Sequence, residues 1–247
     1  MSDPILAYHN LFESGTVTVT EEDASYLKEN AYDWKPFDWW KPTTAAATTY
    51  ITVDSGAAVS ADYWGIWSYA NIDSIQLQES TDNFAADTTD VGAAVVPTAS
   101  ELIFRTFTSS SKRYRRLKII HTSVFSLGIA CVGVRIDVPA PLPPGFSPLQ
   151  RDNKILGSKT GANHFLGKSV ERRGFDFTLP FDLLTNTFMR NTMEAFIDHA
   201  EVKPFFFSWD QTNYQDEAAF CEVIGKINVP YSTPNRFKAT MRVKGVR

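Results

Sequence analysis

The segment SIQLQES, residues 74–80, has the most regular alternation of polar and apolar side chains in the chain. Ile75 and Leu77 point to one face of an extended strand, and the glutamines that follow each of them point to the other, because successive side chains of a strand alternate. Such alternation is typical of an antiparallel sheet that is buried on one face only. The segment therefore predicts a strand whose sheet packs against a second layer.

Further short β-rich segments flank this strand, and polar turns separate them. Repeated short strands of this kind indicate a β-sandwich or a β-barrel. We expect two polar loops between the strands, at residues 45–49 and 81–100. The predicted strands are Thr16–Thr20, Tyr50–Val53, Tyr63–Trp67, Ser74–Glu79, Leu102–Phe107, Tyr114–His121 and Val124–Val138.

A proline-rich segment divides the chain. Residues 139–148 contain five prolines, which lack a backbone N–H and fix φ, so neither a helix nor a central strand can continue through them. We therefore predict a β-sandwich domain at residues 1–138, a linker at residues 139–150 and a second module at residues 151–247.

The second module is predicted to be α+β with one main helix. Asp182 is expected to cap a helix that runs to about Ala200, and its apolar stripe is interpreted as core packing. A polar stretch, Gln150–Gly161, precedes the first strand of this module. The predicted strands are Arg172–Phe181, Pro204–Trp209, Phe220–Ile227 and Phe237–Val246. The whole chain is thus expected to be mainly β.

Composition and charge exclude several classes of protein. The formal net charge is −4, which argues against a general nucleic-acid binder because phosphate binding needs excess positive charge. No run approaches the ~20 apolar residues that a membrane helix requires, so we expect no membrane insertion. The first residues lack a secretory signal pattern, and the two cysteines lie in apolar segments. We therefore expect synthesis in a reducing host cytoplasm, where disulfides rarely persist.

Motifs for catalysis and for cofactor binding are missing from the sequence. Five residues separate Gly161 from Gly167, whereas a phosphate-binding loop requires four. The four histidines are scattered, and no GxSxG motif occurs. We expect no catalytic residue, no metal site, no cofactor and no enzymatic activity. A glycosidase stays open as a second alternative, because a sequence does not give the distance between two carboxylates such as Asp210 and Asp216, or Asp87 and Asp90.

The most unusual local feature is the aromatic segment WKPFDWWKP, residues 34–42. Its two prolines impose an irregular path on the backbone. Trp34, Trp39 and Trp40 are tentative ligand-binding residues, since flat indole faces beside Asp and Lys can stack on a sugar ring. The alternative is that the same rings plug one end of the sandwich or form a subunit contact.

Four motifs occur in an order that suggests a known fold. They are YITVDSG at residues 50–56, YWGIW at 63–67, IQLQESTD at 75–82 and RYRRLKI at 113–119. Together they resemble the galactose-binding-like, discoidin-type jelly rolls over about residues 30–138. The resemblance implies an N-terminal jelly-roll β-sandwich, in which the turn at residues 54–56 defines the fold and is not a ligand site.

The second half carries a less specific resemblance. The segments GFDF at residues 174–177, PFFFSWD at 204–210 and the basic ending VKGV at 243–246 look like those of phage tail proteins. This likeness implies a structural protein of a phage virion, in the tail or baseplate, that assembles into a ring with copies of itself and with neighbouring tail or baseplate proteins. Residues 236–247 are interpreted either as an intersubunit strand or as a solvated edge strand.

Two functions follow from these features. The main hypothesis is a structural virion protein that acts through protein–protein assembly. The alternative is a carbohydrate-binding module that recognises a glycan of the host cell surface through loops at one end of the sandwich.

Overall fold

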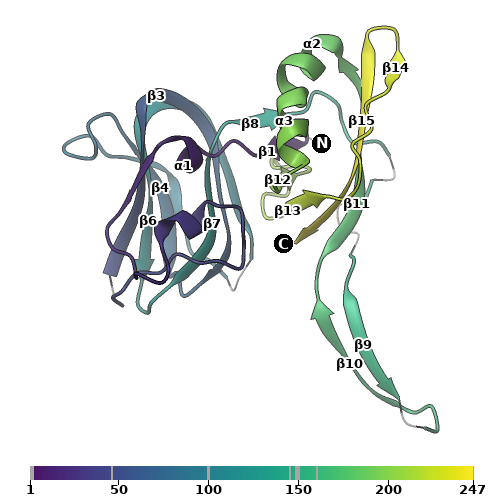
Figure 1. Ribbon diagram of the computed structural model, residues 1–247, viewed down its shortest axis with the longest axis horizontal. Helices are drawn as coiled ribbons and strands as arrows, with labels where there is room; N and C mark the ends of the chain where they lie inside the picture. Colours follow the sequence, from purple (N-terminus) through teal and green to yellow (C-terminus); the bar gives the residue numbers. More distant parts are fainter. Residues whose placement is uncertain are drawn as a thin grey trace.

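A computed structural model describes residues 3–45, 47–98, 101–144, 146–147, 151–159 and 161–246 of the chain. These residues form a mainly β protein with two bodies, a jelly-roll β-sandwich and a mixed module in which one helical segment packs on an antiparallel sheet (Figure 1). The predicted fold class is confirmed.

The jelly roll contains six strands and two short helical turns. Its strands pair in the order β2-β3-β6-β4-β5, and β7 pairs with the other part of β3. The strands are β2 (Thr16–Val19), β3 (Ala47–Ala70), β4 (Ser74–Ser80), β5 (Thr89–Val95), β6 (Ile103–His121) and β7 (Ser126–Gly133), and the turns are α1 (Leu11–Ser14) and η1 (Lys28–Ala31).

The long strand β3 belongs to both layers of the sandwich. Its first part pairs with β2, its last part pairs with β7, and β6 follows it through both. The register shifts between Asp54 and Val59, where Gly56 has a φ of 74° and donates its N–H to the Asp54 carboxylate at 2.8 Å. A β-bulge increases the bend and twist of a strand. The DSG motif thus lies where the sheet turns from one layer to the other.

Both predicted loops contain strand residues. β3 begins at Ala47, inside the loop expected at residues 45–49, and β5 occupies residues 89–95 of the loop expected at 81–100. In the described part of the chain β5 pairs only with β4, and its small side chains are largely exposed. An edge strand without a buried face does not alternate in polarity, which explains why the pattern did not reveal it.

The second module is built on one antiparallel sheet with the order β11-β15-β13-β12-β1-β8, and β14 pairs with β15. Its strands come from both ends of the chain. They are β1 (Ile5–Ala7), β8 (Arg135–Asp137), β11 (Phe175–Thr185), β12 (Phe205–Ser208), β13 (Ala218–Val223), β14 (Tyr231–Thr233) and β15 (Arg236–Val246).

The strand pairing differs from the division predicted at residue 138. β1 and β8 lie within residues 1–138, yet they belong to the sheet of the second module, where Leu6 faces Ile136 and Ala7 faces Arg135. The jelly roll is therefore an insertion between two neighbouring strands of that sheet. Three-residue strands carry no periodicity, so the sequence pattern could not place them.

The sheet of the second module is covered on both faces. In β12, Phe205 and Phe207 pack in the core under the helical segment, whereas Phe206 packs in a cluster with Tyr63 and Phe104 of the jelly roll. This two-sided burial explains the uninterrupted aromatic run at residues 205–207, because a strand that is buried on both faces has no solvent-facing position.

The helical segment comprises α2 (Asn186–Phe188), a π-helical turn η2 (Met189–Met193) and α3 (Glu194–Ala200). It ends where the sequence predicted, but it begins later. Residues 182–185 still belong to β11, and the hydroxyl of Thr185 accepts the N–H of Phe188 at 3.2 Å in place of a cap by Asp182. Met193 and Phe196 of this segment are fully buried in one core with Phe205 of the sheet. No helix among the described residues is both long and apolar enough to span a membrane.

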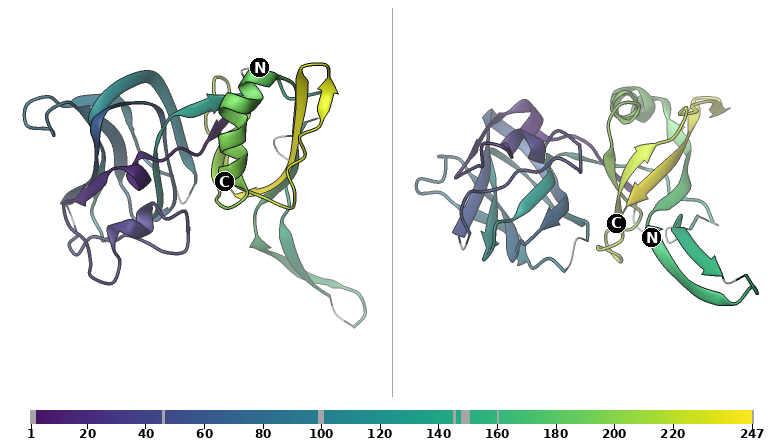
Figure 2. Two further views of the ribbon diagram at one scale, coloured as in Figure 1. Left: turned by 45° about the horizontal axis from the view of Figure 1, so that its top comes forward. Right: turned by 60° about the horizontal axis from the view of Figure 1, so that its bottom comes forward.

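A two-stranded hairpin projects from the second module (Figures 1 and 2). It consists of β9 (Lys154–Lys159) and β10 (Phe165–Arg172), which among the described residues pair only with each other. β9 lies in the polar stretch Gln150–Gly161, where no strand was predicted, and residues 150 and 160 of this stretch lie outside the described part. Every described side chain of β9 is exposed, so burial does not impose a pattern on its sequence.

The two chain segments that join the bodies come very close together at His9 and Gly133. A Cβ atom built on Gly133, at the end of β7, would lie 1.9 Å from the backbone oxygen of His9. Gly133 is therefore required where the chain enters and leaves the jelly roll.

We predict that Gly133→Ala destabilises the protein by about 2 kcal/mol or more, because the added methyl overpacks against backbone that cannot move away. The melting temperature should fall by roughly 5 °C. Gly161→Ala is the matched control, since a Cβ there meets no atom within 4 Å. Equal melting temperatures for the two variants would contradict this account of the junction.

A buried ion pair fixes strands β4 and β6. Arg115 is fully buried, and its Nε donates to Glu79 at 2.9 Å. Its other nitrogens donate to the carbonyl oxygens of Lys112, Val59 and Ser110 at 2.8–3.1 Å. Because these acceptors belong to β3 and β6, the guanidinium connects the two strands where the sandwich bends.

We expect Arg115→Met to cost about 3–5 kcal/mol of unfolding free energy, because the substitution leaves the Glu79 carboxylate buried without a cation. Arg113→Met is the control: it removes a neighbouring pair, Arg113–Asp54, that is exposed to solvent. Urea unfolding of both variants measures the difference. If Arg115→Met were no more destabilising than Arg113→Met, the buried pair would not have this role.

Candidate functional site

A cavity of about 360 Å³ lies between the jelly roll and the second module. The jelly roll contributes residues 34–37 and Trp67 to its wall, and the second module contributes the ends of β11, β13 and β15 together with Pro204. Both bodies are needed to form it. Its volume lies within the range of small-molecule sites in proteins, and its lining is mainly apolar, as is usual for such sites.

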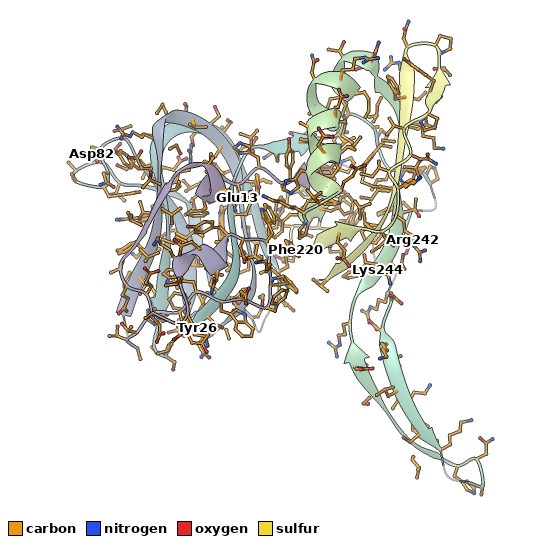
Figure 3. The ribbon with its side chains drawn as sticks, viewed as in Figure 1. Glu13, Tyr26, Asp82, Phe220, Arg242 and Lys244 are labelled. Carbon is orange, nitrogen blue, oxygen red and sulfur yellow. The ribbon has the colours of Figure 1, made fainter. Side chains whose placement is uncertain are left out.

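Three stacked aromatic rings form the inner wall. The ring of Phe220 lies between the indoles of Trp34 and Trp67, with centroid distances of 6.2 and 5.2 Å and interplanar angles of 13° and 23°. Figure 3 shows Phe220 at the junction of the two bodies. Trp67 is only partly buried, and Phe37 at the cavity's edge is 66% exposed. Aromatic surface is therefore accessible to a ligand.

Trp34 occupies an unusual position for a large side chain. Its φ is 66°, in the left-handed region that bulky residues rarely adopt, and only 4% of the residue is exposed. The stack with Phe220 and an edge contact with His199 at 5.3 Å hold the indole in place. Its Nε1 is buried and donates no hydrogen bond to any residue in the described part of the chain. An unsatisfied donor of this kind is costly.

Charged groups of both signs surround the cavity. Lys35 is exposed, and its hydrogen bond with Asp33 raises the pKa of the ammonium group, so it stays charged at neutral pH. Glu222 and Lys244 lie opposite each other on β13 and β15. Cys221 also lines the wall, and burial raises the pKa of its thiol far above the usual range. This cysteine is therefore a neutral, unreactive group.

The other two predicted ligand residues lie outside this cavity. Trp40 is fully buried in the jelly-roll core, where its ring packs edge-on against Phe125 with a centroid distance of 5.1 Å. Its indole N–H donates to the backbone carbonyl oxygen of Glu21 at 3.3 Å. Trp39 is 37% exposed, and the Lys41 ammonium lies 5.6 Å from its ring centroid. Of the three indoles in residues 34–42, one therefore lies at the module junction, one at the surface and one in the core.

Several cavity residues were missed by the sequence reasoning. Trp67 and Phe220 were assigned only to strands, and nothing in the pattern places them beside residues 34–37. Trp34 and Phe220 are far apart in the chain, and only the insertion of the jelly roll into the second sheet brings them together. One feature of the sequence could have indicated the contact between the two bodies. The aromatic run at residues 205–207 has no polar position, which indicates a strand that is buried on both faces.

The carboxylates that were considered for glycosidase chemistry have structural partners. Asp210 is buried and accepts two hydrogen bonds from the Asn213 amide at 2.9–3.0 Å, while Asp216 forms an ion pair with Arg105 at 3.0 Å. Asp87 accepts the Thr81 N–H and hydroxyl, which lower its pKa. Within the described residues, no group of three or more His, Cys, Asp or Glu side chains is arranged to hold a metal ion.

Known proteins were compared with the chain. No protein-family model and no curated protein matches it. Among solved structures, chitosan-binding module 1 of a Paenibacillus sp. IK-5 chitosanase/glucanase is 20% identical, with a TM-score of 0.45 over 51% of this chain and 98% of its own. A CBM32 module from Clostridium perfringens, solved with GalNAc-β-1,3-galactose, is 17% identical, with a TM-score of 0.43 over 49% and 96%.

A Ruminococcus gnavus GH29 fucosidase matches about the same share of this chain. It is 14% identical, with a TM-score of 0.46 over 52% of this chain and 27% of its own. The three alignments each cover about half of this chain. None of these three structures is a phage tail or baseplate protein.

Proposed function

We propose that this protein binds carbohydrate without catalysis and that the cavity at the module junction is the binding site. The observation that carries the proposal is the accessible aromatic wall formed by Trp67 and Phe37 in a cavity with charged groups at its edge. A sugar ring has an apolar face that can lie on an aromatic ring and hydroxyl groups at its edge that need hydrogen-bond partners.

The polar groups of the cavity suit the edge of such a ring. Lys35, Glu222 and Lys244 provide both donors and acceptors within reach of a cavity occupant. A ligand oxygen that reached the Nε1 of Trp34 would also satisfy a donor that has no partner in the described structure. The proposed site thus includes one of the three predicted indoles, Trp34, and adds Trp67, Phe37 and Phe220.

Binding is tested by calorimetry and by intrinsic fluorescence, since two indoles line the cavity. Suitable probes are chitotriose, GalNAc-β-1,3-galactose and 4,5-unsaturated mannuronic acid, with which similar structures were solved, followed by a glycan array. We expect Phe37→Ala to weaken binding roughly fivefold, because it removes a stacking contact worth about 1 kcal/mol.

The control is Phe165→Ala on the projecting hairpin, where the side chain is 67% exposed, about as much as that of Phe37. This control should bind the saccharide like the unmodified protein. The proposal fails if no glycan produces heat or a fluorescence change, or if the two alanine variants bind equally well.

A second function, assembly into a larger structure, is favoured by the hairpin β9–β10, whose strands pair with no other strand of the described chain. The role as a structural component of a phage tail or baseplate is the finer form of this proposal. Mass spectrometry of purified phage particles tests it, and consistent absence of the chain from them would exclude a virion location.

A further inference from the structure

The hairpin β9–β10, called the arm below, exposes apolar surface that nothing in the described chain covers. Ile155, Val170 and Phe165 are 51%, 46% and 67% exposed. An isolated two-stranded hairpin is at best marginally stable in water. Surface of this kind is typical of a contact with another molecule.

The register of the arm gathers these side chains on one face. Ile155 lies opposite Val170, Gly157 opposite Lys168, and Lys159 opposite Phe165. Directly opposed residues of an antiparallel pair point to the same side. One face of the arm, called the arm face, therefore carries Ile155, Val170, Lys168, Lys159 and Phe165.

The arm is also one of the basic segments of an acidic protein. Residues 154–172 contain four Lys or Arg and one acid, so their formal charge is 4 − 1 = +3, and the remaining residues carry −4 − 3 = −7. Glu171 pairs with Lys154 at 2.7 Å, near the base of the arm. Lys168 forms no ion pair with the residues described, and Lys159 donates only to the Asn163 amide oxygen at 2.9 Å. The arm face thus presents two lysines without a carboxylate.

A complementary surface lies on the outer side of the helical segment. Glu194, Asp198 and Glu201 are exposed, are spaced at i, i+4 and i+7, and form no ion pair within the described structure. We call these residues, together with Val202, which is 78% exposed, the acidic helix face. Asp198 and Glu201 stand near the helix C-terminus, where negative charge is unfavourable, and like charges at i and i+4 repel each other.

The arm of a molecule does not reach its own acidic helix face. The helical segment and the arm project from different ends of the second module in all views (Figures 1 and 2). Lys159 and Lys168 lie on neighbouring strands of the arm, and the register offsets them along it by two positions, or about 7 Å. Along the helix, Glu194 and Asp198 are offset by about 6 Å. Both pairs are therefore close enough together for two ion pairs to form in one contact.

We propose that the arm face docks on the acidic helix face of a second copy of this chain. The lysines pair with the three acids, and the apolar side chains of the arm pack beside Val202. Each copy presents both an arm and an acidic helix face. The contact can therefore close into a dimer with two reciprocal arms or into a larger ring, or continue as a filament. This inference does not depend on the glycan site, which the other side of the module forms with the jelly roll.

A charge-swap experiment tests the proposal by light scattering and electron microscopy. The unmodified protein should form oligomers that dissociate as salt is added. Lys159→Glu/Lys168→Glu should be monomeric, because its arm repels the acids, and Glu194→Lys/Asp198→Lys/Glu201→Lys should be monomeric for the opposite reason. An equimolar mixture of the two should assemble again, since each arm then meets a helix of opposite charge.

Lys118→Glu/Lys226→Glu is the control with the same change of charge at two sites outside the arm, and it should assemble like the unmodified protein. Equal melting temperatures of all variants show that the substitutions act on assembly. A strictly monomeric unmodified protein, an oligomer that ignores the arm lysines, or failure of the mixture to assemble would overturn the proposal. So would an arm that binds only duplex DNA or anionic vesicles. Glycan binding, measured on the same samples, should be unchanged throughout.

Discussion

The position of β1 between β8 and β12 is the constraint on which the two-body structure depends. This strand of three residues pairs on one side with the last strand before the proline-rich segment and on the other with a strand near the chain's end. The two ends of the jelly roll are thereby held side by side, so closely that Gly133 has no room for a methyl group. A contact at a single hinge would let the bodies rotate, whereas this double connection limits their relative motion.

The same constraint creates the cavity. Because the jelly roll is inserted into the sheet, one of its sides must cover a face of that sheet, and Phe206 and Phe220 pack there among jelly-roll side chains. The jelly roll does not cover this face of the sheet completely, and a cavity stays open beside Trp67 and Phe37. The stack of three rings needs both bodies, because Trp34 and Trp67 come from the jelly roll and Phe220 comes from the second module. A binding site at such a junction is common in proteins that consist of two domains.

The sequence pattern predicted the strands and the helix that have one buried and one exposed face. It did not predict strands that are very short or largely exposed. The segment at residues 74–80 is a strand, and the helix ends near Ala200, because alternation and the apolar stripe report one-sided burial. β1, β5 and β9 are too short or too exposed to show a pattern. Of the tentative ligand residues, Trp34 lines the cavity and Trp40 is in the core. The difference depends on long-range packing that the local sequence does not contain.

We propose that a saccharide binds at the module junction. The most direct test is a crystal structure of the protein with a saccharide that calorimetry has shown to bind. The account predicts a sugar ring in the junction cavity, in contact with Trp67 and Phe37 and with polar atoms of both bodies. A sugar bound only by jelly-roll loops, with the cavity between the bodies empty, would contradict it.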